Sequence, residues 1–319
     1  MEPLQVVGLG LASLDVLVRL KDMPTWRGGT RVSQFALDGG GPVGTAVAAA
    51  ARLGARAGFI GTAGNDAAAR MKLESLSNTG VDLSRTVIRN EPEDQVILVC
   101  VNELTGDRVF SGLKSLISSP LRIDELDRAY ITSAEYLHLE GCHYQAALQA
   151  AKWMREAGKT VVFDGGTTSG GVGEGTRALL EYVHVLICGA GFAPGLTGKQ
   201  DAMDAGRAAL AFGPRIVVQT DGAAGSITTT AAEQFHTPAF PVDVVDTTGA
   251  GDVFHGAYIV GLLHGWPLPA IGQFASAVAA IKCTRLGGRA GIPSLADTLA
   301  FLMERGIAMP GEQSGQNLG

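Results

Sequence analysis

Short apolar runs and helical stretches alternate through the second half of the chain. Apolar runs occupy residues 135–139, 160–164, 183–188 and 215–220, and a helical stretch at residues 144–157 separates the first two. Apolar runs of about four to eight residues are typical of strands that are buried on both faces. Strands alternating with helices predict a mostly parallel central sheet with helices on both faces, so we expect an α/β fold.

The N-terminal part of the chain continues this pattern. Residues 4–9 and 57–62 read as buried strands, and an alanine-rich helix between them ends at Gly54. Another helix, rich in small residues, is expected at residues 274–283. We expect a single domain over residues 1–312, followed by a disordered tail at residues 313–319.

Two segments interrupt the alternation of strands and helices. Residues 16–37 alternate apolar and polar positions, and residues 95–114 form two such runs around a turn at Gly106. A period of two residues predicts half-buried antiparallel strands, and we expect both segments to join in one small sheet, a lid beside the main sheet. If the exposed face of the lid is apolar, as Val96, Leu98 and Phe110 indicate, it offers a surface for a homodimer.

Composition and charge exclude several classes of protein. The chain has 319 residues, 46% of them hydrophobic, and a formal net charge of −6, so it can bury a full core but has no basic bias toward nucleic acid. No apolar run reaches the roughly eighteen residues of a membrane span, and the first residues lack the basic segment of a secretory signal. We therefore expect a cytoplasmic protein without membrane or nucleic-acid partners. The four cysteines are far apart and are expected to be free thiols.

The most informative stretch is VDTTGAGDVFHG at residues 245–256. Residues 240–245 read as an extended strand, and residues 253–264 carry apolar positions at helical spacing. Small residues between a strand and a helix let the backbone approach a ligand, and the N–H groups of a helix N-terminus bind phosphate. Asp252 adds a carboxylate that can take a proton from a hydroxyl group. The alternative is an ordinary turn in which an aspartate caps the helix.

The sequence DTTGAGDVFHGA resembles the second signature of the PfkB (ribokinase-like) family of sugar and nucleoside kinases. The resemblance implies a three-layer α/β/α sandwich with a mostly parallel sheet and a small lid. It also implies an ATP-dependent kinase that uses Mg²⁺ and acts on a small sugar. Asp252 would then be the base, and the amides of Gly249, Ala250 and Gly251 would hold the transferring phosphoryl group.

Residues 38–45, DGGGPVGT, resemble the first signature of this family. The resemblance implies that Gly40 and Gly41 contact the sugar and that Asp15 binds sugar hydroxyls. Thr45 stands where most members have asparagine. Its shorter side chain cannot make the same paired amide contact, so the placement of the substrate is open at this point.

Further motifs concern the nucleotide and its ions. Most members carry Asn-x-x-Glu, which orders water around Mg²⁺, but Gly189 and Phe192 stand at these positions here. The resemblance also makes Asp246 and Thr248 candidate ligands of a monovalent cation such as K⁺. The ATP contacts that it implies are Thr220, Gly222, Gly225 and Ser276.

The resemblance leaves the acceptor open. VDVVDTTGAGDVFHGA and KCTRLGGRAGIP are most similar to the sulfofructose kinase branch, whereas residues 137–141 are similar to ketohexokinase. A sulfonate needs a cationic partner, for which Lys114 is the candidate, whereas Glu140 would bind neutral hydroxyls and repel an anion. We therefore favour a ketohexose-like acceptor, with sulfofructose kinase and nucleoside kinase as alternatives. The missing Asn-x-x-Glu favours an alternative of another class, a non-catalytic regulator that binds sugar or nucleotide.

Several other features have simpler explanations. The glycines of GLGLAS at residues 8–13 are a weak dinucleotide motif, because Ser stands where a third glycine is wanted. GKT at residues 158–160 follows a helix and precedes a strand, which is the reverse of a P-loop. Arg108, Arg285 and Arg289 are expected to be solvated loop charges.

Overall fold

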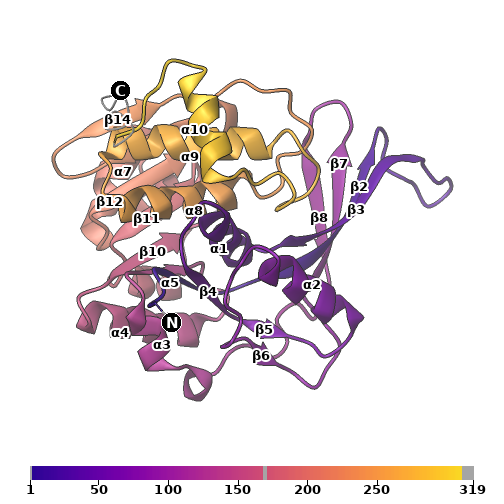
Figure 1. Ribbon diagram of the computed structural model, residues 1–319, viewed down its shortest axis with the longest axis horizontal. Helices are drawn as coiled ribbons and strands as arrows, with labels where there is room; N and C mark the ends of the chain where they lie inside the picture. The colour runs from indigo at the N-terminus through magenta and orange to yellow at the C-terminus, as the bar shows by residue number, and fades with distance from the viewer. Residues whose placement is uncertain (1, 168–170, 311–319) are drawn as a thin grey trace, which may run out of the picture.

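The computed structural model describes residues 2–167 and 171–310 (Figure 1). The expected tail at residues 313–319 lies outside the described residues. The described chain forms a body around an eight-stranded sheet, and a four-stranded lid projects from one side of the body (Figure 1). The body has the three layers that were predicted.

Apolar, β-branched runs supply most strands of the body sheet. In chain order the strands are β1 (Val6–Leu9), β4 (Ala57–Ile60), β9 (Tyr136–Leu139), β10 (Thr160–Asp164), β11 (Val185–Gly189), β12 (Ile216–Thr220), β13 (Ser226–Thr229) and β14 (Gln234–Thr237). Their order across the sheet is β14-β13-β12-β11-β10-β9-β1-β4, and all neighbours are parallel except at β13 and β14. The carboxyl ends of the parallel strands therefore lie along one edge, where ligands bind in open α/β sheets.

Helices cover both faces of this sheet. One face packs on α1 (Pro42–Arg52), α8 (Ala250–Leu263), α9 (Leu268–Lys282) and α10 (Leu295–Met303). The other packs on α3 (Arg128–Ser133), α4 (Tyr144–Glu156), α5 (Glu174–Leu180), α6 (Phe192–Thr197) and α7 (Ala202–Ala209). Val162 of β10 enters the first core and Val161 and Phe163 enter the second, as alternation along a strand requires. None of the helices in the described ranges combines the length and hydropathy that a membrane span needs.

The lid is the small sheet that was predicted from the two interrupting segments. Its strands lie in the order β3 (Val32–Gly40), β2 (Ser13–Leu20), β7 (Val96–Asn102) and β8 (Arg108–Gly112). The pair β2 and β7 is parallel, contrary to the expectation of antiparallel strands, because the chain returns from the body to form β7. At the base of the lid, α2 (Ala67–Ser77) packs on β2 and β3. The short strands β5 (Thr62–Ala63) and β6 (Val87–Ile88) form a separate parallel pair.

In the C-terminal half one prediction was wrong and one hairpin was missed. Residues 240–245 do not form a strand, because the N–H of Val245 donates to the carbonyl of Cys283 at the end of α9 (2.8 Å) rather than to a neighbouring strand. The antiparallel hairpin of β13 and β14 was not predicted. Its threonine-rich strands lack the apolar runs that identify the other strands.

Candidate active site

The Gly-Ala-Gly turn leaves free backbone amides at the N-terminus of α8. Gly249 adopts a left-handed conformation (φ 73°) and packs against the backbone of Gly288, where a side chain would be strained. The first regular helical bond runs from the N–H of Val253 to the carbonyl of Gly249 (2.9 Å). The N–H groups of Gly251 and Asp252 have no acceptor among the described residues, whereas that of Ala250 reaches Thr247 (3.2 Å). Free amides at the positive end of a helix suit a phosphoryl group.

Asp252 lies in the first turn of α8, beside these amides. Burial raises the pKa of its carboxyl group to about 7, and the negative charges of Asp164 and Asp15 act in the same direction. The positive charges of Arg108 and Lys282 oppose this rise. A carboxyl group with a pKa near neutrality can exchange a proton efficiently with a bound hydroxyl.

Asp15 lies on β2 and faces the glycine loop of the first signature. Its side chain is buried, and one carboxylate oxygen accepts a hydrogen bond from the hydroxyl of Ser13 (2.7 Å). Burial raises the pKa of Asp15 to about 6. A Cβ on Gly40 would overlap the Asp15 carboxylate, and one on Gly41 (φ 83°) would overlap the backbone of Leu11. The two glycines are therefore needed for the loop to pass beside Asp15.

Arg289 is a residue of this region that sequence reasoning misjudged. It was expected to be solvated, but only 4% of its surface is exposed, and its guanidinium donates to the carbonyl of Gly40 (2.5 Å) and the hydroxyl of Ser75 (3.2 Å). Side chains at Gly39 or Gly44 would overlap the guanidinium. The glycines at residues 39 and 44 leave room for the guanidinium and could have indicated its position. They lie about 250 positions before Arg289 in the sequence, so no local pattern connects them to it. Arg285 is exposed, as expected.

Glu140 and Thr45 were expected to contact the sugar. In the structure Glu140 accepts hydrogen bonds from the backbone, and Thr45 is buried on α1. The Glu140 carboxylate accepts from the N–H groups of Leu11 (2.8 Å) and Val43 (3.2 Å), so it ties the end of β9 to the start of α1. Burial raises the pKa of Glu140 to about 8. Thr45 is fully buried on α1, and its hydroxyl has no partner among the described residues. Glu140 is half-buried and each of its oxygens already accepts one bond, whereas the Thr45 hydroxyl is unpaired but fully buried, so their contacts with a sugar stay predictions.

The lid reaches the active site through the tip of its β7–β8 hairpin. The Arg108 guanidinium donates to the hydroxyl of Thr247 (2.8 Å), and this hydroxyl donates to the carbonyl of Gly106 (3.2 Å). Arg108 is exposed, as expected of a solvated charge, and it also lies beside the second signature. Lys114 is exposed after β8, and no ion pair joins it to the described residues.

The predicted ATP residues lie at the carboxyl end of β12 and on α9. Thr220 ends β12, and Gly222 (φ 48°) is exposed in the following turn, with open space beside its Cα. Gly225 (φ 92°) is buried against the backbone of Thr237, where a side chain would not fit. Ser276 is nearly buried on α9. Thr220 and Gly222 remain the accessible candidates for a nucleotide contact.

Of the two residues expected to bind a monovalent cation, Asp246 has protein partners, whereas the buried hydroxyl of Thr248 has none among the described residues. The carboxylate of Asp246 accepts from the N–H groups of Thr248 (2.8 Å) and Gly287 (2.8 Å). Its main-chain carbonyl accepts from the ammonium group of Lys282 (3.0 Å), and Lys282 is fully buried. A fixed ammonium group thus takes one of the Asp246 oxygens, so Asp246 does not fit a K⁺ site in this conformation.

Gly189 and Phe192 stand where most family members carry Asn-x-x-Glu, and neither side chain can bind Mg²⁺. Gly189 ends β11 beside the hydroxyl of Thr167. Phe192 is buried and packs on Phe163, with 6.5 Å between the ring centroids. We therefore assign no protein ligand to Mg²⁺, which in kinases is held largely by phosphate oxygens and water.

A comparison with protein families identifies the class. Residues 6–295 match the model of the pfkB family carbohydrate kinases. Because this match spans most of the chain, the chain belongs to the PfkB family of carbohydrate kinases, and it is a phosphotransferase of the ATP-dependent type found in that family.

Named relatives cover nearly the same length. The ATP-dependent ribose-1-phosphate kinase of Halopiger xanaduensis is 28% identical over 301 residues, which cover 94% of this chain and 99% of that protein. The 2-dehydro-3-deoxygluconokinase of Bacillus subtilis is 30% identical over 277 residues, which cover 79% and 82%. The ribokinase of Arabidopsis thaliana, solved with ribose and ATP, has a TM-score of 0.79 at 24% identity and covers 95% of this chain and 99% of its own. This last likeness shows the ribokinase fold.

Proposed function

We propose that this kinase transfers the γ-phosphoryl group of ATP to a primary hydroxyl of a ketohexose-like sugar. The observation that carries the proposal is the Asp252 carboxylate at the free amides of α8, within electrostatic range of the buried Asp15. The Asp252 carboxylate can take the proton of the sugar hydroxyl, whose oxygen then attacks the phosphoryl group. The amides of α8 can stabilise the negative charge of that phosphoryl group.

The proposed step needs little covalent chemistry from the protein. Asp252 takes the proton of the acceptor hydroxyl as its oxygen bonds to the γ-phosphorus, while the bond from that phosphorus to the β–γ bridging oxygen breaks and ADP leaves. The amides of Gly251 and Asp252 stabilise the transferring phosphoryl charge. Mg²⁺ bound to ATP would neutralise phosphate charge. Asp15 accepts hydrogen bonds from sugar hydroxyls and fixes the acceptor in place.

Lys282 supports a proposal about the cation requirement. Its buried ammonium group bonds to the Asp246 carbonyl at the position that was expected to bind K⁺. We propose that this ammonium supplies the positive charge beside the second signature, so turnover does not need K⁺. Turnover should be equal in potassium and tetramethylammonium chloride at one ionic strength. Activation by K⁺ of more than about tenfold, or about 1.4 kcal/mol, would contradict this proposal.

A second candidate acceptor is a sugar acid or sugar phosphate, and Arg108 favours it. The argument for a neutral acceptor relied on Glu140, whose carboxylate is engaged by backbone amides. Arg108 brings a guanidinium to the second signature, and guanidinium groups bind carboxylates and phosphates well. Two named relatives, a ribose-1-phosphate kinase and a 2-dehydro-3-deoxygluconokinase, have anionic acceptors by name.

One experiment separates these acceptors. Values of kcat/KM should be measured at saturating ATP for fructose, 6-deoxy-6-sulfofructose, 2-dehydro-3-deoxygluconate, ribose 1-phosphate and adenosine. A ketohexose preference of at least about tenfold supports the first proposal. A preference of that size for an anionic sugar replaces it with the second, and turnover of adenosine alone would overturn both.

We also propose that two copies associate through the outer face of the lid. Residues that pair across neighbouring strands project from the same face of the lid. One set of such partners includes Leu37, Val16 and Leu98. The next set on that face includes Phe35, Cys100 and Val109. Leu37, Leu98, Phe35 and Val109 are all exposed, which is unusual for a sheet face with no cover. Phe110, which was expected on this face, pairs with Val99 and belongs to the opposite one.

Sedimentation velocity tests the association. The chain should sediment as a dimer at micromolar concentration, and Leu98→Asp should shift it to a monomer, whereas Met303→Asp, at an exposed apolar position on α10, should not. A monomeric native chain at about 100 µM would contradict the proposal, because apolar interfaces of standard size bind more tightly than this.

A further inference from the structure

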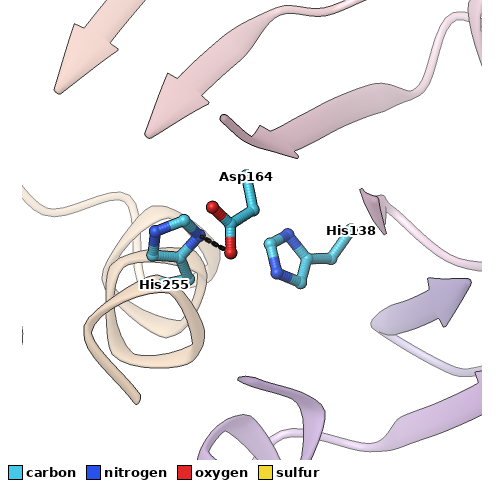
Figure 2. Close-up of side chains that lie close together, drawn as sticks. All are labelled: His138, Asp164 and His255. Carbon is cyan, nitrogen blue, oxygen red and sulfur yellow. Dashed lines mark ion pairs between the residues drawn. The ribbon is translucent and has the colours of Figure 1, made fainter. Parts of the chain in front are cut away.

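Three buried polar side chains meet beneath the active site. His138 of β9, Asp164 of β10 and His255 of α8 are 0%, 7% and 3% exposed (Figure 2). Each offers a nitrogen or oxygen atom, and these atoms lie within 4.8 Å of one another. The function proposed above assigns no task to any of the three.

Strand register explains why the side chains converge. His138 pairs with Val162 on the neighbouring strand, so both side chains project from the same face of the sheet. Asp164 lies two residues after Val162 and shares that face. This is the face covered by α8, and His255 projects from α8 toward the Asp164 carboxylate (Figure 2).

The cluster does not satisfy its own hydrogen-bonding groups. Both ring nitrogens of His138 and the Nδ1 of His255 are buried without a hydrogen-bond partner among the described residues. His255 Nδ1 lies 3.7 Å from Asp164 Oδ2, which is too far for a hydrogen bond. The imidazole rings are 5.4 Å apart between centroids, and the carboxylate lies between them (Figure 2). Buried polar atoms are nearly always paired, so this arrangement points to a missing ligand.

We propose that His138, Asp164 and His255 bind a divalent transition-metal ion, with Zn²⁺ as the best match. Two imidazoles and one carboxylate are a donor set for zinc and similar ions, whereas Mg²⁺ prefers oxygen ligands alone. The donors of a tetrahedral zinc ion lie about 3.4 Å apart, given bonds of about 2.0–2.1 Å. The 3.7 Å pair is close to this spacing, and all three donor atoms lie within 4.8 Å of one another, so the ion would draw the side chains closer together. Water completes the coordination.

The ion would fasten α8 to two strands of the central sheet. His255 follows the proposed base Asp252 by one turn of the same helix, so the metal would hold the helix that carries the base. Its role is structural, and the inference does not depend on the proposed acceptor or on turnover.

Metal uptake by the full-length protein tests the site. Protein stripped with a chelator should bind one equivalent of Co²⁺, with the visible absorption of tetrahedral cobalt, and Zn²⁺ should displace it. Zn²⁺ at a hundredfold excess over its Kd should raise the Tm by about 4 °C for a chain of this size. His138→Asn and His255→Asn should each lose the cobalt spectrum and the Tm shift. The control is His264→Asn, at an exposed position immediately after α8, which should keep both.

Two results would overturn the proposal: native protein that takes up less than about a tenth of an equivalent of either ion at 100 µM, or cobalt binding that survives both substitutions. If a variant does not fold, nitrogen NMR of histidine-labelled native protein decides the matter. Zn²⁺ should shift the ring-nitrogen resonances of two histidines, and unchanged spectra would reject the site.

Discussion

The body and the lid are both built from short strands, but they are stabilised in different ways. In the body, two cores of buried side chains fill both faces of the sheet. In the lid, the buried apolar cluster contains Leu17, Val99 and Val101, and the outer face carries exposed apolar side chains. Free energy of burial is roughly proportional to the apolar area removed from water, so the body should be rigid and the lid easily opened.

This difference separates two tasks. The proposed base and the anion site lie on α8, a helix packed into the body. Asp15, which we propose to bind the acceptor, and Arg108, which contacts the second signature, lie on lid strands. A rigid body can preorganise the phosphoryl site, whereas a mobile lid can admit the sugar and then close over it.

Hydrogen exchange should show the largest contrast. Amides of β2, β7 and β8 should exchange at least about a thousandfold faster than those of β10 and β11 in the free protein, because lids open locally while core strands exchange only on global unfolding. Addition of the acceptor sugar should slow the lid amides selectively. Equal protection in the free protein would remove the distinction between the two regions.

Removing the proposed base on α8 should abolish most of the turnover without changing the structure of the lid. Asp252→Asn keeps the shape of the side chain but cannot take a proton, so kcat should fall by about 100- to 10,000-fold with little change in ATP affinity. Asp243→Asn, at an exposed position nearby, is the control and should keep full turnover. A variant at position 252 that retains more than about a tenth of native kcat would show that Asp252 is not the base.

The buried ion pair at the base of the lid should have the next largest effect. Lys72 Nζ lies 2.6 Å from Glu93, both side chains are fully buried, and Lys72 also donates to the carbonyl of Thr62 (3.0 Å). Lys72→Met should lower the free energy of unfolding by about 3–5 kcal/mol, because it leaves a buried carboxylate without its partner. Arg128→Met breaks an exposed pair with Glu156 and should cost less than about 1 kcal/mol. Similar losses in urea unfolding of the two variants would contradict this account.

The parts that sequence reasoning predicted correctly are those with a local signal. Apolar runs identified the parallel strands of the body, and the DTTGAGD motif identified the start of α8 to within a few residues. Glu140 and Arg289 could not be placed in the same way. Glu140 bonds to amides at Leu11 and Val43, and Arg289 bonds to Gly40, so their environments depend on residues about 100 to 250 positions away. Periodicity carries no information about such contacts.

Arg108 joins the lid to the body through its hydrogen bond to Thr247, and removing its side chain should have a moderate effect on kcat/KM. Arg108→Ala loses the hydrogen bond to Thr247 and a positive charge near the transferring phosphoryl group, so kcat/KM should fall about tenfold. Lys114→Ala removes an exposed charge from the same region and should change kcat/KM less than about twofold. The reverse order of effects would identify Lys114 as the cation that serves the acceptor.

The smallest effect expected is a shift of the pH profile of kcat/KM. This shift measures how strongly the positive charge of Arg108 changes the pKa of Asp252. The proposed base must be ionised, and its pKa is raised to about 7, so kcat/KM of the native protein should fall about tenfold per pH unit below that value. The positive charge of Arg108 lowers the pKa of Asp252, so Arg108→Ala should move the acidic limb to higher pH. The shift should be less than about one unit, because Arg108 is exposed and water screens its charge, and it should shrink further in about 1 M salt. Lys114→Ala should leave the limb in place. A limb that does not move in Arg108→Ala at low salt would mean that the lid contributes contacts to the acceptor but no charge to the base.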